Sequence, residues 1–166
     1  NEYFGFKPDL ICLSKAIANG FSISALVGTD ALKSIVHSVF YTGTYWYDAI
    51  SMSAALATLK ELKRIDAPAL ILEKGKKLFV GMMGIAKDHG FSLKITGSPS
   101  MPYVRIDGED WLTLTQHWCG ECTKRGAYFV SHHNWFVTAA HTDDDIKETL
   151  AIVDDAFTAL KKKFPS

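Results

Sequence analysis

The sequence predicts an α/β protein, in which short apolar strands alternate with amphipathic helices. Residues 10–13 (LICL) form an apolar run between Asp9 and Ser14, as in a buried parallel strand. Downstream, strand-like runs alternate with stretches whose apolar residues recur at helical spacing. Lys15 stands directly after the first strand, at the carboxyl edge of the expected sheet, where α/β folds bind ligands. Burial there would leave a neutral amine that can attack a carbonyl, so Lys15 is the first catalytic candidate.

The first third of the chain is rich in turns. Residues 24–28 (SALVG) predict a second strand, and Thr29 or Asp30 is expected to cap a helix that runs to about residue 36. A Thr42-Gly43-Thr44 turn follows. From Asp48 to about residue 64, apolar and small residues recur at helical spacing, with Asp48 as the expected N-cap.

A long helix is expected over residues 68–89, with Gly90 as its stop. Three glycines inside this stretch each cost about 1 kcal/mol relative to alanine, so a kink or a shorter helix is expected. These glycines are Gly75, Gly81 and Gly84. Strands are expected next at residues 91–96 and 101–106, with a turn between them at 97–100.

The last part of the chain continues the alternation. A helix over residues 111–124 is expected to end before Gly126, and two short β-like runs follow at 128–130 and 135–138. A closing helix is expected after its cap Thr142. Three aspartates lie in its first turn and three lysines in its last, which suits the helix dipole. We therefore interpret the aspartates as helix-start charges and not as a cation site.

The sequence also predicts a boundary between two domains. Glycine-rich strands and turns give way to a regular alternation of helices and strands near residues 60–68. We place the boundary between residues 1–62 and residues 63–166.

Composition narrows the class of protein. The 166 residues carry 18 Lys and Arg against 18 Asp and Glu, so no net field attracts nucleic acid or an anionic membrane. No apolar run approaches the roughly 20 residues of a membrane span. Three cysteines suit a reducing, cytoplasmic setting better than a disulfide framework. The chain opens on NEYFGF, without a starting Met or a signal peptide, which we interpret as a fragment or an internal start.

Several segments occur together in an ordered pattern. They are PDLICLSK, AIANG, ISALVG, TGTYW with the alanine-rich helix after it, and, near the end, KRGAYF and FVTAAHTDDDIKETL. This pattern resembles the class III aminotransferases of fold type I, which carry pyridoxal 5′-phosphate (PLP), and within them the glutamate-1-semialdehyde 2,1-aminomutase-like group. The resemblance implies that residues 1–62 are the C-terminal part of the PLP-binding large domain and residues 63–166 a C-terminal small α+β domain.

The resemblance also implies roles for three residues. Lys15 matches the lysine that holds PLP as a Schiff base and then moves the α-proton. Thr44 matches the residue that binds the cofactor phosphate from the neighbouring subunit, and Gly43 lets the backbone approach that phosphate. The implied reaction transfers an amino group between an amino acid or amine and an oxo acid or aldehyde. The implied assembly is a homodimer with shared active sites.

Two departures from the family pattern leave alternatives open. Residues 45–48 (YWYD) replace the family's Ser-Gly-Asn-Pro turn, so the substrate class is open. The upstream half of the large domain is not in the sequence, so the chain is expected to form only part of the site. The alternatives are a catalytically incomplete fragment or dimerisation module, and a PLP-dependent racemase or decarboxylase of the same fold.

Other candidates have simpler interpretations. Cys119 and Cys122 form a CxxC beside His117, but no second ligand pair accompanies them and both fall in an expected helix, so no metal site is predicted. The histidines at 132, 133 and 141 are interpreted as packing or surface residues. The aromatic run at 45–47 is expected either to line a substrate pocket or to fill a dimer interface.

Overall fold

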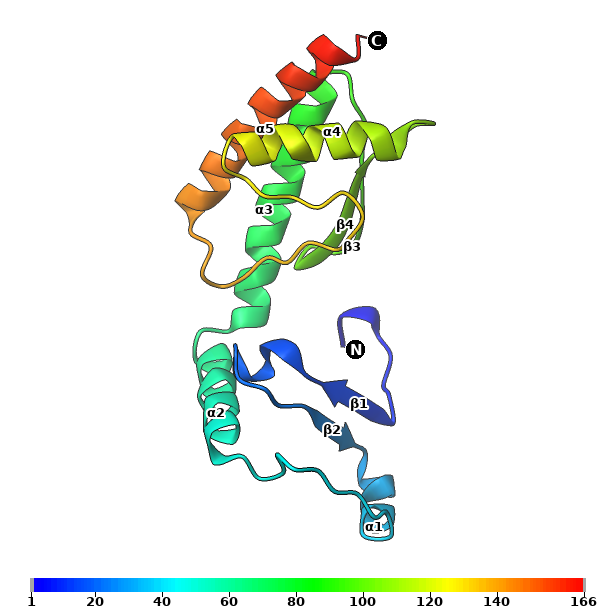
Figure 1. Ribbon diagram of the computed structural model, residues 1–166, viewed down its shortest axis with the longest axis vertical. Coiled ribbons are helices and arrows are strands. Elements are labelled where there is room, and N and C mark those ends of the chain that lie inside the picture. The colour runs from blue at the N-terminus through cyan, green and yellow to red at the C-terminus, as the bar shows by residue number, and fades with distance from the viewer. Residues whose placement is uncertain (1, 166) are drawn as a thin grey trace. The chain divides into compact units, whose positions relative to one another are not determined.

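A computed structural model describes residues 2–165 of the chain (Figure 1). Its internal contacts divide the chain into two compact units, Asn1–Ile65 and Asp66–Ser166, here called unit 1 and unit 2. The elements of unit 1 are η1 (Glu2–Phe4), β1 (Leu10–Leu13), η2 (Lys15–Ala18), β2 (Ala25–Gly28), η3 (Asp30–Leu32), α1 (Lys33–Val36) and α2 (Ala49–Arg64). The elements of unit 2 are α3 (Ala67–Asp88), β3 (Leu93–Ser98), β4 (Met101–Ile106), α4 (Trp111–Lys124) and α5 (Asp143–Lys163).

The first strand, β1, lies where the sequence predicts it, but the prediction that it is a buried strand of a parallel sheet is wrong. It pairs with β2 in an antiparallel two-stranded sheet, with Leu10 opposite Gly28 and Leu13 opposite Ala25. A parallel pair needs a long crossover, usually a helix, whereas residues 14–24 contain only a short 3₁₀ turn. Within unit 1 no layer covers this ribbon, and Leu10 is 53% exposed.

Helix α2 begins as the sequence predicts. The Asp48 side chain accepts hydrogen bonds from the backbone N–H groups of Ile50 and Ser51, at 3.3 and 3.1 Å. The turn η2 packs against α2, and small residues are buried in both elements: Ala18 in η2, and Ser51 and Ala55 in α2. This contact holds the segment after Lys15 against the helix that follows the Gly43 turn.

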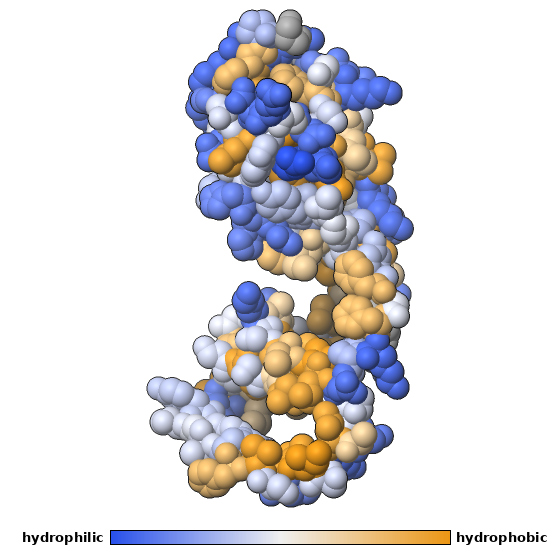
Figure 2. All heavy atoms as spheres, turned by 90° about the vertical axis from the view of Figure 1, so that its right-hand side faces the viewer, coloured by the Kyte–Doolittle hydropathy of each residue, from blue (hydrophilic) through white to orange (hydrophobic). Residues whose placement is uncertain are grey.

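The short helix expected before residue 36 is divided in two. The 3₁₀ turn η3 comes first and α1 continues it, and Thr29 precedes η3 without a side-chain capping bond. Unit 1 leaves many large apolar side chains exposed, and Figure 2 shows apolar residues over much of its visible face. Since a two-stranded ribbon and one long helix enclose little volume, the apolar residues of unit 1 exceed what it can bury.

In unit 2, α3 is one helix of 22 residues, so the expectation of a shorter helix is wrong. Gly75 is buried and lies close to the turn between β3 and β4, where a larger residue would not fit. Gly90 ends the helix with a φ of 85°, the left-handed conformation of a C-terminal stop.

Strands β3 and β4 form an antiparallel hairpin with Ser98 paired to Met101. The tight turn therefore lies at residues 99–100, and β3 starts and ends two residues later than the sequence predicts. Helix α4 covers the predicted residues 111–124 and packs against β4, where Thr115 Oγ1 accepts a 3.0 Å hydrogen bond from the Ile106 N–H.

The β-like runs expected at 128–130 and 135–138 are wrong, because the described structure contains no strand there. Residues 135–137 nevertheless run alongside the start of β4 and are hydrogen-bonded to it and to the turn before it. The Trp135 N–H donates to the Pro102 carbonyl at 2.8 Å, and the Val137 N–H donates to the Ser100 carbonyl at 3.0 Å. These two bonds are too few for a strand, and the apolar alternation there reflects buried Trp135 and Val137.

Helices α3 and α4 both pack on α5, and around the same aromatic core α3 packs on β3 and α4 on β4. Trp118 lies at its centre, with ring centroids 5.0 Å from Phe157, 5.8 Å from Phe129 and 6.0 Å from Trp135. Four rings of this size bury a large apolar area, which gives unit 2 its own core.

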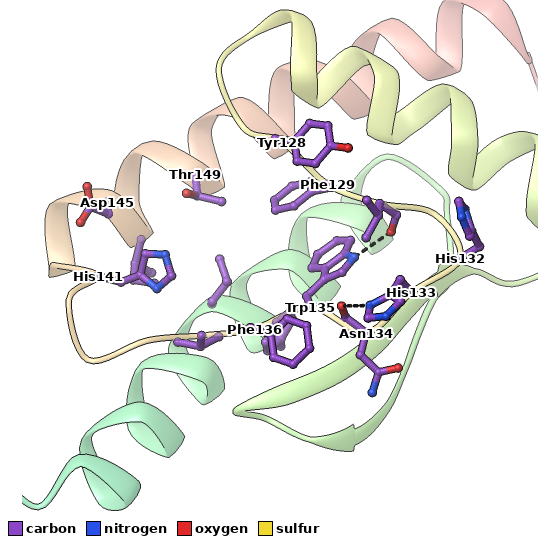
Figure 3. Close-up of a pocket in the computed structure, with 15 residues that line it drawn as sticks. Tyr128, Phe129, His132, His133, Asn134, Trp135, Phe136, His141, Asp145 and Thr149 are labelled. Atoms are coloured by element: carbon purple, nitrogen blue, oxygen red, sulfur yellow. Dashed lines mark hydrogen bonds between the residues drawn. The ribbon is translucent and has the colours of Figure 1, made fainter. Parts of the chain in front are cut away.

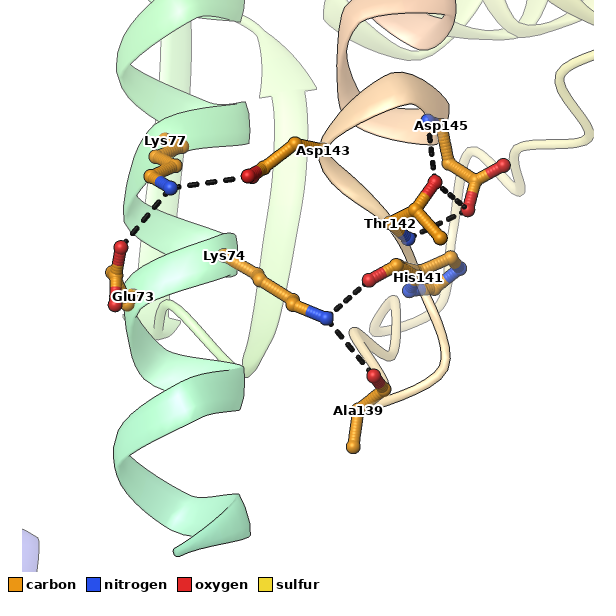
Figure 4. A network of polar contacts seen from close by, with 8 residues as sticks. All are labelled: Glu73, Lys74, Lys77, Ala139, His141, Thr142, Asp143 and Asp145. Carbon is orange, nitrogen blue, oxygen red and sulfur yellow. Dashed lines mark hydrogen bonds and ion pairs between the residues drawn. The ribbon is translucent and has the colours of Figure 1, made fainter. Parts of the chain in front are cut away.

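Polar contacts fix the start of α5 (Figure 4). Thr142 caps the helix in a reciprocal capping box with Asp145, as the position of Thr142 predicts. From α3, Lys74 Nζ donates to the carbonyl oxygens of Ala139, at 2.9 Å, and His141. Lys77 bridges Glu73, at 3.0 Å, and Asp143, at 3.2 Å. Among residues 2–165, no helix has both the length and the apolar character to cross a membrane.

Candidate functional site

Unit 1 contains an open cavity of about 1350 Å³ that we call the lysine hollow. It brings together the three residues that the sequence singles out, Lys15, Gly43 and Thr44. The other lining residues are Ser14, Gly20, Phe21, Ser22, Ile23, Ser24, Tyr45, Trp46, Tyr47, Asp48, Ser51 and Met52. The lining residues come from two segments of unit 1: residues 14–24, which follow β1, and residues 43–52, which lead into α2 and form its first turn.

Lys15 has an unusual backbone. It begins η2 with a φ of 54°, a left-handed conformation that costs a residue with a Cβ about 1–2 kcal/mol. Strain of this kind persists where the surrounding structure imposes it and gathers at functional sites. The Lys15 side chain is exposed, so the expectation of a buried lysine is wrong for unit 1, because the two-stranded ribbon leaves its edge uncovered.

The opposite wall of the lysine hollow is the turn at residues 43–46. The Trp46 N–H donates a 3.2 Å hydrogen bond to the Gly43 carbonyl, which closes the turn with Thr44 inside it. Hydroxyl groups surround the hollow on both sides: those of Ser14, Ser22, Ser24, Thr44 and Ser51. Hydroxyls and turn amides are the donors that bind phosphate oxygens in proteins.

Asp48 is the acidic residue of the lysine hollow, but its carboxylate is engaged. The Ser51 side chain and the Ser51 and Ile50 N–H groups bond to it, and these bonds lower the pKa of Asp48 below its usual value. The carboxylate is therefore ionised and held at the start of α2. Among the described residues that line the hollow, Lys15 is the one cation.

This arrangement fits a ligand with an aldehyde and a phosphate group. A lysine amine can attack an aldehyde carbon. The turn at Gly43 and Thr44 adds the Thr44 hydroxyl and backbone amides to the lining of the hollow. Phe21 and the aromatic residues at 45–47 add flat apolar surface beside these polar groups.

Unit 2 contains a second cavity of about 540 Å³, the aromatic hollow (Figure 3). Trp135 and Phe129 form its floor, with parallel rings whose centroids are 4.2 Å apart. Tyr128, Phe136 and three histidines line its sides. No lysine or cysteine lines it, so the described part of this hollow lacks the nucleophile that the lysine hollow has.

The histidines of the aromatic hollow make local contacts. His141 Nδ1 accepts a 3.1 Å bond from the Thr138 N–H, and His133 Nδ1 donates to the Asn134 carbonyl at 2.9 Å. Residues 2–165 contain no cluster of three or more metal-ligating side chains. These contacts agree with the interpretation of the histidines as packing and surface residues.

Cys119 and Cys122 are free thiols buried in the core of unit 2. Burial raises the pKa of Cys119 to about 12, and burial together with the neighbouring Cys119 raises the pKa of Cys122 further still. A thiol that stays protonated is a poor nucleophile and a poor metal ligand. The CxxC is therefore part of the hydrophobic core.

The aromatic run at 45–47, expected to line a pocket or to fill an interface, lines the lysine hollow, but two contacts within the site were not predicted from the sequence. Trp46 packs on Gly43, and Ser51 bonds to Asp48 across the first turn of α2. A signal for the second pair was present, because a serine three residues after an aspartate N-cap can reach its carboxylate. The packing of Trp46 depends on the turn backbone and has no comparable sequence signal.

Comparison with known proteins identifies the relatives of this chain. A model of the family described as aminotransferase class-III matches residues 1–157. The aminopentol aminotransferase of Sphingopyxis macrogoltabida is 35% identical over 164 residues, which are 99% of this chain and 39% of that protein. A glutamate-1-semialdehyde 2,1-aminomutase of Caldivirga maquilingensis is 29% identical over an alignment of 177 positions, which covers 96% of this chain and 41% of that protein. The chain thus spans about two fifths of the length of these relatives.

Solved structures show the same fold. The FumI protein of Sphingopyxis sp. MTA144, solved in its PLP internal aldimine form, superposes with a TM-score of 0.92 at 35% identity, over 99% of this chain and 40% of that one. A β-phenylalanine aminotransferase from Variovorax paradoxus superposes with a TM-score of 0.82 at 21% identity, over 98% of this chain and 41% of that one. Both units therefore have the fold of the matching part of a PLP-dependent transaminase.

Proposed function

The chain belongs to the class-III aminotransferase family, and from this premise we propose that the protein is a PLP-dependent aminotransferase or aminomutase. It would move an amino group between an amino acid or amine and an oxo acid or aldehyde. The observation that carries the proposal is the place of Lys15, which has a left-handed backbone and lines an open cavity of unit 1. The names of the relatives, aminotransferases and aminomutases, support the same reaction class.

Lys15 is the proposed catalytic residue. Its Nζ would hold the aldehyde carbon of PLP and, once released by the incoming amine, take the proton from the substrate carbon and return it. Bound PLP would supply an electron-withdrawing ring that stabilises negative charge on that carbon. The left-handed backbone of Lys15 fixes where the side chain leaves the chain, which supports a positioned amine over a mobile surface lysine.

Gly43 and Thr44 are the proposed phosphate-binding residues. The Thr44 hydroxyl and the turn N–H groups would donate to phosphate oxygens, and glycine at position 43 leaves room for the Trp46 ring beside the turn. In unit 1 they line the same hollow as Lys15 of the same chain, whereas the family resemblance implies that Thr44 serves the neighbouring subunit. We propose the second arrangement, because the exposed apolar surface of unit 1 suits a subunit interface.

We further propose the setting of the reaction. The protein would act as a homodimer with shared active sites, on a small-molecule amino donor and oxo acceptor, in the cytoplasm, where its three free thiols stay reduced. Unit 1 would be the end of the PLP-binding large domain, and unit 2 the C-terminal small domain. The separate core of unit 2 supports this division.

Reduction with borohydride tests the role of Lys15. The full-length protein, incubated with PLP and then reduced, is expected to carry a pyridoxyl adduct on the peptide that contains Lys15. The Lys15→Ala variant should lose the adduct and the transaminase activity. Lys33→Ala, which removes an exposed lysine of α1 outside the hollow, should keep both. An adduct on another lysine in the wild-type protein would overturn the assignment.

Mixing two variants tests the shared site. If Thr44 serves the neighbouring subunit, a mixed dimer of Lys15→Ala and Thr44→Ala subunits has one site with both changes and one with neither. Such dimers should recover about half of the wild-type activity per dimer, counted from the number of intact sites. If both residues act within one chain, every site carries one change and mixing restores nothing.

A labelled donor separates the two reaction classes. Transfer between molecules moves ¹⁵N from the donor to a different acceptor and leaves an oxo product. Transfer within one molecule leaves the nitrogen in the isomerised substrate. The 35% identity to an aminotransferase favours transfer between molecules, and ¹⁵N retained within a single product would contradict it.

A further inference from the structure

The indole of Trp46 lies directly on Gly43. A Cβ built on Gly43 would be 2.5 Å from Cδ1 of the Trp46 ring and closer still to Nε1. Real Cβ contacts essentially never fall below 3.0 Å, so the ring fills the space that any larger residue would need. The Gly43 position is therefore covered by one side chain, and that side chain belongs to the same turn.

Neighbouring aromatic rings hold the indole in place. The Tyr41 ring centroid lies 4.4 Å from that of Trp46, at an interplanar angle of 46°. The Tyr47 ring lies 6.2 Å away on an edge contact of 72°. Three rings thus support one another around a turn that has no regular secondary structure.

The backbone of the same segment is fixed at both ends. At its start, the Trp46 N–H donates to the Gly43 carbonyl at 3.2 Å. At its end, Asp48 caps α2, and Tyr47 has a φ of 62°, which large side chains seldom adopt. A bulky residue keeps a left-handed backbone only where its surroundings impose it. These contacts constrain the backbone of the turn at both ends.

We propose that Trp46 is a positioning residue for the cofactor phosphate, an inference that rests on the proposed PLP function of the lysine hollow. Its ring covers Gly43 and holds the Gly43-Thr44 backbone in one conformation, so the Thr44 hydroxyl and the turn amides face the phosphate without first being ordered. Without the ring, the binding of PLP itself must order the turn. Ordering the backbone of about one residue costs free energy that lowers the affinity for PLP roughly tenfold.

Two other roles for Trp46 make different predictions. If the ring were part of a substrate wall, its removal would raise the KM of the amine and leave PLP affinity unchanged. If the indole N–H bound the phosphate directly, a phenylalanine at this position would be as harmful as an alanine. The positioning role predicts loss of PLP affinity with alanine and retention with phenylalanine, because a phenyl ring still covers Gly43.

The experiment measures the dissociation constant of PLP for the full-length apoprotein by fluorescence titration, and separately the KM of the amine at saturating PLP. Trp46→Ala is expected to weaken PLP about tenfold with little change in the KM of the amine. Trp46→Phe should stay within about threefold of wild type. Phe136→Ala, which removes an exposed aromatic of unit 2 that does not line the lysine hollow, is the matched control and should match wild type.

A double-mutant cycle tests the contact itself. Gly43→Ala pushes against the indole, so it should weaken PLP more in the wild-type background than in Trp46→Ala. Equal effects in both backgrounds, wild-type PLP affinity in Trp46→Ala, or equal losses in the alanine and phenylalanine variants would each overturn the proposal. If wild-type protein formed no adduct at Lys15, the PLP function itself would fail, and this outcome is separate from the others.

Discussion

Gly75, in the middle of α3, lies against the carbonyl group of Pro99 in the turn between β3 and β4, two residues far apart in the sequence. A Cβ on Gly75 would be 2.6 Å from the Pro99 carbonyl carbon. Because backbone atoms cannot move aside cheaply, we expect Gly75→Ala to destabilise unit 2 by about 2 kcal/mol. Denaturant unfolding monitored by tryptophan fluorescence measures this change.

Gly84 is the matched control on the same helix. A Cβ there meets nothing within 4 Å, so Gly84→Ala should stabilise the protein by about 1 kcal/mol through helix propensity alone. Opposite signs for the two substitutions are the expected result. If both substitutions raised the free energy of unfolding, the hairpin would not press on α3.

Lys74 holds the segment before α5. Its Nζ donates to the Ala139 carbonyl at 2.9 Å and to that of His141, and its side chain is half-buried. Hydrogen bonds to a charged donor contribute about 1.5–3 kcal/mol, so Lys74→Met should lower the free energy of unfolding by about 2 kcal/mol. Because the acceptors are neutral carbonyls, salt should change this difference little. Lys76→Met, at an exposed position of the same helix, should change stability far less.

The hydrogen bonds between Thr142 and Asp145 predict that the free energy of unfolding depends on pH. Hydrogen bonds from the Thr142 backbone and side chain, at 2.6 and 2.8 Å, lower the pKa of Asp145 below its usual value of 3.8. A carboxyl group whose folded pKa is depressed stabilises the fold above pH 4, and this contribution is lost as pH falls through the folded pKa. We expect Thr142→Ala to cost about 1 kcal/mol at pH 7 and less at pH 3.

Urea unfolding at pH 7 and pH 3 checks this prediction. Asp144→Asn, in the same helical turn, leaves the capping box intact and should not reproduce the change with pH. A loss for Thr142→Ala that stayed constant between pH 7 and pH 3 would contradict the role assigned to Asp145.

The three thiols should differ in reactivity. Cys12 is exposed, whereas Cys119 and Cys122 are buried with raised pKa values. At pH 8, a maleimide should label Cys12 in the native protein and reach the other two only after unfolding. Peptide mass spectrometry before and after denaturation measures the labelling. Native labelling of Cys119 at a rate similar to Cys12 would show that α4 opens readily.

Local signals explain which parts of the fold the sequence predicts. The N-caps Asp48 and Thr142 and the bounds of α4 depend on neighbours within a few residues, and the structure has them where the sequence places them. Strand pairing depends on partners elsewhere in the chain. The apolar run at 10–13 carries no information on whether its neighbour runs parallel, and the run at 135–138 packs into a core without becoming a strand.

The candidate site divides in the same way. The family pattern in the sequence predicts Lys15, Gly43 and Thr44 as site residues, and the structure brings them to one hollow. Two features needed the structure: the left-handed backbone at Lys15 and the indole packed on Gly43. Both arise from how a turn folds back on itself, which residue types alone do not specify. The same holds for Gly75, whose constraint comes from the Pro99 backbone.

At the left-handed backbone of Lys15, selection for stability and selection for an amine favour different residues. Any side chain with a Cβ carries the same conformational cost at a φ of 54°, and only glycine escapes it. Lineages selected for heat tolerance alone would drift toward glycine at this position and lose the amine. If Lys15 holds PLP as proposed, its amine is what keeps a lysine at this position. In a descendant of this sequence, glycine at position 15 would indicate a protein that retains the fold and has lost the catalytic amine.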